Sequence, residues 1–133
     1  MKPEELMIGD WVFNTHHEKN VQITPYDFFT HGHYPDGTQY ITVSHSIVSG
    51  QDFEPIPITS EILEKNGFFE VVDNCKYATY HLKNIKTNIV MFPTPELTIF
   101  TDKKILIHGL PIHYVHELQH ALRLCKIDKE IVL

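Results

Sequence analysis

The sequence predicts an α+β fold: one antiparallel, β-rich domain over residues 1–133, with a short helix in its middle and an amphipathic helix packed on the sheet at its end. Three observations predict this class. Short runs of β-branched and aromatic residues recur along the chain and are separated by turn-forming residues. The dipeptide Asp36-Gly37 is typical of a hairpin turn. The last long segment carries apolar side chains at helical spacing, and 133 residues fit a single domain.

The N-terminal part should form a small, barrel-like sheet. We expect a strand over residues 11–13 to pair with a second strand over residues 21–24. Asp36-Gly37 should close a hairpin with arms over residues 26–34 and 38–48, because both residue types adopt positive φ readily. The second arm alternates and is expected to be half-buried. Its more apolar face consists of Ile41, Val43, His45 and Ile47.

The middle of the chain predicts a short helix followed by a β-meander. Prolines keep residues 53–58 extended, and Thr59 or Ser60 can then cap a helix that ends before Gly67. Five β-rich runs follow, over residues 68–72, 77–83, 85–92, 97–101 and 104–108. Several aromatic residues are expected in the core, namely Trp11, Phe28, Phe29, Phe68 and Phe69.

The final helix, predicted over residues 112–126, is the clearest periodic element. An apolar stripe should be buried against the sheet, and it consists of Val115, Leu118, Leu122 and Cys125. Polar residues fall on the opposite side, which we expect to face solvent and to be the interaction face of the protein. They are His113, His116, Glu117 and His120.

The same helix contains an HExxH motif over residues 116–120. Two histidines one helical turn apart can bind one Zn²⁺, so His116 and His120 are candidate ligands, with His113 as a further one. Glu117 would be the general base that activates a zinc-bound water. This arrangement predicts a zinc-dependent metallohydrolase as the alternative function.

A catalytic zinc needs a third protein ligand, and the spacing does not supply one. Lys126 stands where the extended motif would have another histidine. Upstream candidates are His31, His33, His45, His81 and His108. With 10 histidines in the chain, the motif also arises by chance. We therefore favour a solvated polar face with no cofactor. Adventitious or structural metal binding by His113, His116 and His120 is the next alternative, and catalysis comes last.

Composition excludes several other functions. The net charge of −6 argues against a general nucleic-acid binder. The longest apolar runs are too short to span a membrane, and the acidic N-terminus is no signal peptide, which predicts a cytoplasmic protein. Cys75 and Cys125 are expected to be free thiols and not a disulfide.

Three blocks of the sequence resemble a known family. Residues 5–12, ELMIGDWV, residues 55–68, PIPITSEILEKNGF, and residues 114–125, YVHELQHALRLC, are similar to patterns in small uncharacterised proteins of Bacteroidetes bacteria and their phages or prophages. That family often has glutamine at the position of Glu117 and asparagine at that of His120. The resemblance therefore implies a mobile-element setting and an amphipathic helix, without zinc chemistry.

Together these observations predict a non-enzymatic, phage- or prophage-associated accessory protein. It would act by protein–protein interaction or self-association, with a protein partner or a homo-oligomer of its own chain. A weaker alternative is an adaptor that binds a small ligand or nucleic acid on an open face of the sheet, which the charge of −6 disfavours for nucleic acid.

Overall fold

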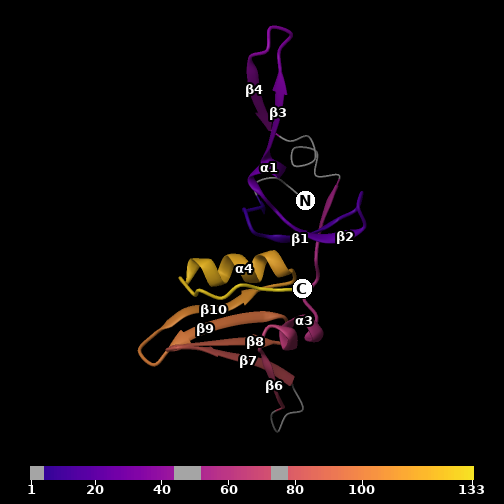
Figure 1. Cartoon of the computed structure of the whole chain (residues 1–133). Coiled ribbons are helices and arrows are strands. Elements are labelled where there is room, and N and C mark those ends of the chain that lie inside the picture. Colours follow the sequence, from indigo (N-terminus) through magenta and orange to yellow (C-terminus); the bar gives the residue numbers. More distant parts are fainter. Residues whose placement is uncertain (1–4, 44–51, 73–77) are drawn as a thin grey trace. The chain divides into compact units, whose positions relative to one another are not determined.

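The computed structural model describes residues 5–43, 52–72 and 78–133 (Figure 1). The chain divides into two compact units, Met1–Ile56 and Pro57–Leu133, which we describe separately. Antiparallel sheets and a C-terminal helix confirm the predicted α+β class. That residues 1–133 form a single domain stays a prediction.

The first unit contains an open three-stranded antiparallel sheet and not a closed barrel. Strand β1 (Trp11–Asn14) lies between β2 (Lys19–Gln22) and β5 (Phe53–Pro55). The predicted pairing of residues 11–13 with the next strand is confirmed, with Val12 opposite Val21, but that strand covers residues 19–22 and not 21–24. The core of this unit consists of Leu6, Val12, Ile23 and Phe53, with Phe28 packed against them.

A one-turn helix, α1 (Pro25–Phe28), was not predicted. Thr24 donates hydrogen bonds from its N–H and its Oγ1 to Asp27 Oδ2, at 2.6 and 2.9 Å. These bonds, with Pro25 at the first helical position, start the turn. The Thr-Pro-Tyr-Asp sequence carries this signal, so the helix could have been predicted.

The hairpin predicted at Asp36-Gly37 is confirmed, with β3 (Phe29–His33) antiparallel to β4 (Gln39–Val43). Of the two turn residues only Gly37 has positive φ, at 88°. The N–H of Tyr34 donates to the Thr38 carbonyl at 2.8 Å, so the loop has three residues, a common hairpin type. The predicted half-buried face of the second arm lies outside the described side chains, and residues 44–48 lie outside the described residues.

The second unit confirms the predicted meander. Its five-stranded sheet is antiparallel throughout, in the order β10-β9-β8-β7-β6. The strands are β6 (Phe69–Val72), β7 (Ala78–Asn84), β8 (Thr87–Phe92), β9 (Glu96–Thr101) and β10 (Ile105–Pro111). Only Ile85 and Lys86 connect β7 to β8, and Ile85 has a φ of 53°.

Helix α3 (Ser60–Lys65) is capped as predicted, because Thr59 Oγ1 accepts a hydrogen bond of 3.2 Å from the N–H of Ile62. Helix α4 (Val115–Leu124) lies over one face of the five-stranded sheet in Figure 1. The apolar layer of this unit includes Ile89, Met91, Leu97 and Ile99 from the sheet and Val115, Leu118 and Leu122 from the helix, all buried. The predicted burial of the helix stripe is thereby confirmed for Val115, Leu118 and Leu122, whereas Cys125, the C-cap residue, is only half-buried.

Helix α4 begins at Val115, three residues later than predicted. Residues 112–114 are extended and pair with the chain before α3: the N–H of Ile58 donates to the His113 carbonyl at 3.0 Å, and Pro57 bridges to Tyr114. This pairing between distant parts of the sequence outweighs the local helical preference. Among the described residues, no helix is long and apolar enough to cross a membrane.

Candidate functional site

The four polar residues predicted to share one face of α4 have different surroundings. His113 precedes the helix and is exposed, whereas Glu117 and His120 are half-buried. His116 is buried, with 6% of its surface exposed, and so is Gln119. The expectation that this whole face is solvated is therefore wrong for His116, because the buried side of α4 is wider than its apolar stripe. That these residues bind a partner stays a prediction.

Glu117 has a structural role at the start of α4. Its Oε2 accepts a hydrogen bond of 3.1 Å from the backbone N–H of His113. Tyr114, the N-cap residue, makes no side-chain capping hydrogen bond. The carboxylate at the third helical position thus satisfies an amide before the helix, much as in a capping box, and its charge suits the N-terminal end.

The imidazole rings of His116 and His120 lie one turn apart, as HExxH requires. Their centroids are 5.6 Å apart in an edge-to-face arrangement, and the His116 ring stacks on Tyr114 at 5.9 Å. In the part of the chain that the structure describes, no group of three His, Cys, Asp or Glu side chains is placed to hold a metal ion. Among these described residues, no third ligand for a zinc ion is placed beside His116 and His120.

The upstream histidines considered as third ligands are spread over different elements. His81 belongs to β7 and His108 to β10, while His33 is exposed at the end of β3. The side chain of His31 and the whole of His45 lie outside what the structure describes. Of the two cysteines, Cys125 has a free thiol and a pKa raised by desolvation, and Cys75 also lies outside the described residues.

The face of the five-stranded sheet opposite α4 forms a second candidate site, which we call the open face. Strand pairing places its side chains in cross-strand rows, because residues directly opposite each other point to the same side. Val71 faces Thr79 in one row, and Phe92 faces Glu96. The open face consists of Phe69, Val71, Thr79, His81, Val90, Phe92, Glu96 and Thr98.

Polar contacts of Thr79 fasten β6 to β7 on this face. Its Oγ1 donates to the Val71 carbonyl at 3.2 Å and is hydrogen-bonded to His81 Nε2 at 2.7 Å. The His81 ring stacks on Phe69, with centroids 5.9 Å apart and planes 24° apart. Phe69 and Val71 nevertheless stay 57% and 38% exposed. The prediction that Phe69 belongs to the core is wrong, since neighbouring residues of a strand point to opposite faces and Phe68 is the buried one.

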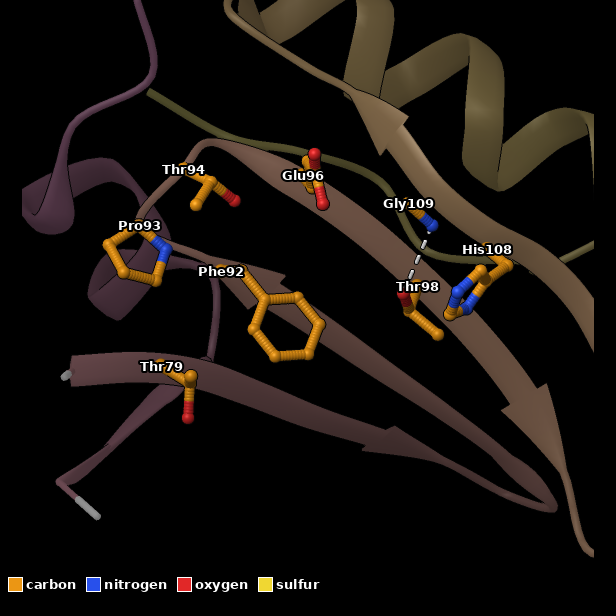
Figure 2. Close-up of a pocket in the computed structure, with 8 residues that line it drawn as sticks. All are labelled: Thr79, Phe92, Pro93, Thr94, Glu96, Thr98, His108 and Gly109. Atoms are coloured by element: carbon orange, nitrogen blue, oxygen red, sulfur yellow. Dashed lines mark hydrogen bonds between the residues drawn. The ribbon is translucent and has the colours of Figure 1, made fainter. Parts of the chain in front are cut away.

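A hollow of about 360 Å³ lies on the open face (Figure 2). It is lined by Thr79, Phe92, Pro93, Thr94, Glu96, Thr98, His108 and Gly109. The N–H of Gly109 donates to Thr98 Oγ1 at 3.2 Å, and Gly109 has a φ of 64° in an irregular stretch of β10. The lining thus combines the exposed Phe92 ring, the His108 imidazole, threonine hydroxyls and the Glu96 carboxylate, and it contains neither Lys nor Arg.

This combination suits the binding of another polypeptide more than a chemical reaction. Aromatic side chains beside hydroxyl groups are typical of protein interfaces, where the ring provides contact area and the polar groups fix orientation. The sequence predicted the strands and, as a weaker alternative, binding of a small ligand or nucleic acid on an open face of the sheet, but not which residues form that face. Alternation shows that two faces exist, whereas the face left uncovered depends on where α4 packs.

A scan against family models finds no match to this chain, and no curated protein and no solved structure matches it either.

Proposed function

We propose that this chain is a non-enzymatic accessory protein that acts by protein–protein interaction or self-association, with the open face as its binding surface. One observation carries the proposal: Phe69, Val71 and Phe92 are exposed on the same side of one sheet, next to a hollow. Soluble proteins rarely expose contiguous apolar surface unless it binds something. Burial of these side chains by a partner would stabilise the complex.

Charge supports a basic partner segment. Glu96 is the only charged residue of fixed sign in the lining of the hollow, and the whole chain carries −6. An arginine from the partner could lay its guanidinium on the Phe92 ring and pair it with the Glu96 carboxylate. Arginine and aromatic residues are frequent anchors of interfaces, so we propose this pair as the anchor point.

A phage or prophage setting is part of the proposal and rests on the sequence resemblance alone, whereas the proposed cytoplasmic location rests on the short apolar runs of the sequence. The three resembling blocks fall on the start of the first unit, on the segment from Pro55 through α3, and on α4 with its flanking residues. These segments contribute to the packing within each of the two units and do not include the open face. The resemblance thus supports a shared architecture, and the role of the open face is argued from its exposed side chains.

Site-specific photo-crosslinking tests the binding surface. A photoreactive phenylalanine analogue in place of Phe92 should give a discrete crosslinked product with another polypeptide or with a second copy of the chain. The same analogue in place of Ile85, which is 87% exposed at the turn after β7, is the matched control and should give none. No discrete product at position 92, or the same product from both positions, would contradict the proposal.

A charge reversal tests the basic anchor. Glu96→Lys should reduce the yield of the position-92 crosslink about tenfold, because it replaces attraction by repulsion of a partner cation. Glu130→Lys makes the same change of charge on an exposed residue near the C-terminus and should leave the yield unchanged. An equal loss in both variants would show that net charge alone steers the partner, and that Glu96 is no anchor.

A further inference from the structure

The exposed edge of strand β6 is the least protected sheet edge in the described part of the two larger sheets. Natural proteins guard such edges with bulges, prolines, lysines or very short strands. Strand β10, the other edge of the same sheet, has two register shifts and ends in Pro111. In the three-stranded sheet, β2 begins with Lys19, and β5 has three residues and ends in Pro55.

Strand β6 contains no bulge, proline or lysine. Its four residues pair with β7 in an unbroken register, and its sequence is Phe-Glu-Val-Val. All four are exposed, Val72 by 63%. The Val71 carbonyl accepts a hydrogen bond from the Thr79 hydroxyl and therefore points toward β7. Because backbone groups alternate along a strand, those of Glu70 and Val72 point outward and are available to another strand.

We infer that β6 pairs antiparallel with β6 of a second copy of this chain. This inference rests on the proposed function and assigns the proposed self-association to the edge of β6. A two-fold axis perpendicular to the sheet pairs the β6 edge of each copy with that of the other. Charge selects the register. Centring the pair on Glu70 would set two glutamates directly opposite, which is unfavourable, whereas centring it on Val71 pairs Glu70 with Val72.

In the register centred on Val71, the outward groups of Glu70 and Val72 form the hydrogen bonds between the copies. The two Val71 side chains then face each other across the axis at the close spacing of a non-hydrogen-bonded pair. Both copies keep the same side up, so their open faces join into one continuous surface. Four residues per strand give a small interface, and we expect a weak dimer with a micromolar or weaker dissociation constant.

Charged substitutions at Val71 test the inference in the full chain. Sedimentation equilibrium of the unmodified protein should show the mass rising from monomer to dimer with concentration. Val71→Lys and Val71→Glu should each raise the dissociation constant about tenfold or more, because like charges then face each other across the axis. An equimolar mixture of the two variants should dimerise again. Ile105→Lys on the guarded β10 edge is the control and should dimerise like the unmodified chain.

Hydrogen exchange of the unmodified protein provides a measurement that needs no variant. The amides of Glu70 and Val72 should become more protected as the concentration rises, and that of Ile105 should not. A monomer at every concentration, an unaffected Val71→Lys variant or a mixture that stays monomeric would overturn the inference. Such a result leaves the proposed function standing if position 92 still crosslinks to a different polypeptide, which distinguishes the two failures.

Discussion

Asn66 and Val132 are joined by two reciprocal hydrogen bonds, although 66 positions separate them in the sequence. Asn66 Nδ2 donates to the Val132 carbonyl and the Val132 N–H donates to Asn66 Oδ1, both at 2.8 Å. The second amide hydrogen of Asn66 reaches the Ile62 carbonyl, also at 2.8 Å. The buried carboxamide acts like one residue of a neighbouring strand and joins the end of α3 to the last residues of the chain.

Replacing this side chain should destabilise the second unit. Asn66→Ala leaves the backbone groups of Val132 unpaired in a partly buried place, and we expect the free energy of unfolding to fall by about 1–3 kcal/mol. Urea denaturation followed by circular dichroism measures the change. Glu130→Ala alters an exposed residue of the same C-terminal segment and should stay within about 0.5 kcal/mol. A similarly small effect for Asn66→Ala would mean that water replaces both bonds.

Two leucines of α4 provide a matched pair for testing how the helix packs. Leu118 is 1% exposed and Leu124 is 77% exposed. Leu118→Ala should lower the free energy of unfolding by about 2–4 kcal/mol, because it removes buried methyl groups and leaves a cavity. Leu124→Ala should change it by no more than about 0.5 kcal/mol. Equal effects in urea denaturation would show that α4 is not held on the sheet by its apolar stripe.

The sequence predicts most of the second unit because its signals are local. Turn residues separate the meander strands, Thr59 caps α3, and Gly67 ends it with a φ of 88°. The start of α4 could not be predicted from local signals, because residues 112–114 pair with the distant segment before α3. The turn at Ile85 could not be predicted either, since a β-branched residue rarely adopts positive φ.

The candidate site depends on non-local packing more than the strands and helices do, and it is therefore harder to predict from the sequence. The HExxH motif predicts two zinc ligands on a solvated face of α4, whereas His116 is buried in the structure. Alternation along the strands predicts two faces of the sheet, but the sequence does not show which of the two is left uncovered. Phe69 and Phe68 have the same apolar character, and only the position of the sheet relative to α4 decides that Phe69 is exposed.

The end of α4 offers a way to stabilise the protein. Lys126 has a φ of 56°, its N–H donates to the Arg123 carbonyl, and the N–H of Ile127 donates to the Leu122 carbonyl, both at 2.9 Å. The same pattern ends α3, where glycine occupies the left-handed position. Lys126→Gly should therefore raise the free energy of unfolding by about 0.5–1 kcal/mol, since glycine adopts this conformation without steric cost.

Urea denaturation would also measure that gain, and Lys129→Gly is the matched control. Lys129 has no positive φ, so glycine there should leave stability unchanged or lower it slightly. If Lys126→Gly destabilised the protein, contacts of the lysine side chain would outweigh the backbone strain.

The hairpin turn of the first unit makes a prediction about pH. The Thr38 hydroxyl donates to Asp36 Oδ1 at 2.7 Å and the Thr38 N–H donates at 2.9 Å, and these bonds lower the pKa of Asp36 below its ordinary value of 3.8. Because the pKa of Asp36 is lower in the folded protein than in the unfolded chain, the ionised carboxylate stabilises the turn at pH values above the unfolded-state pKa. This stabilisation is lost as the pH falls through the folded-state pKa. Thr38→Val removes the hydroxyl and should move the Asp36 pKa, measured by NMR titration, back toward 3.8. An unchanged pKa would mean that the hydroxyl bond does not form in solution.

Glu117 separates the proposed function from the zinc alternative. Because its carboxylate accepts the His113 N–H, Glu117→Gln should retain the bond through the amide oxygen and change the free energy of unfolding by no more than about 0.5 kcal/mol. Glu117→Ala removes the bond and should cost about 0.5–1 kcal/mol. Elemental analysis of protein purified without metal-affinity resin provides the independent measurement. Stoichiometric zinc, or a biological activity abolished by Glu117→Gln in a protein that stays folded, would contradict a purely structural Glu117 and favour the hydrolase.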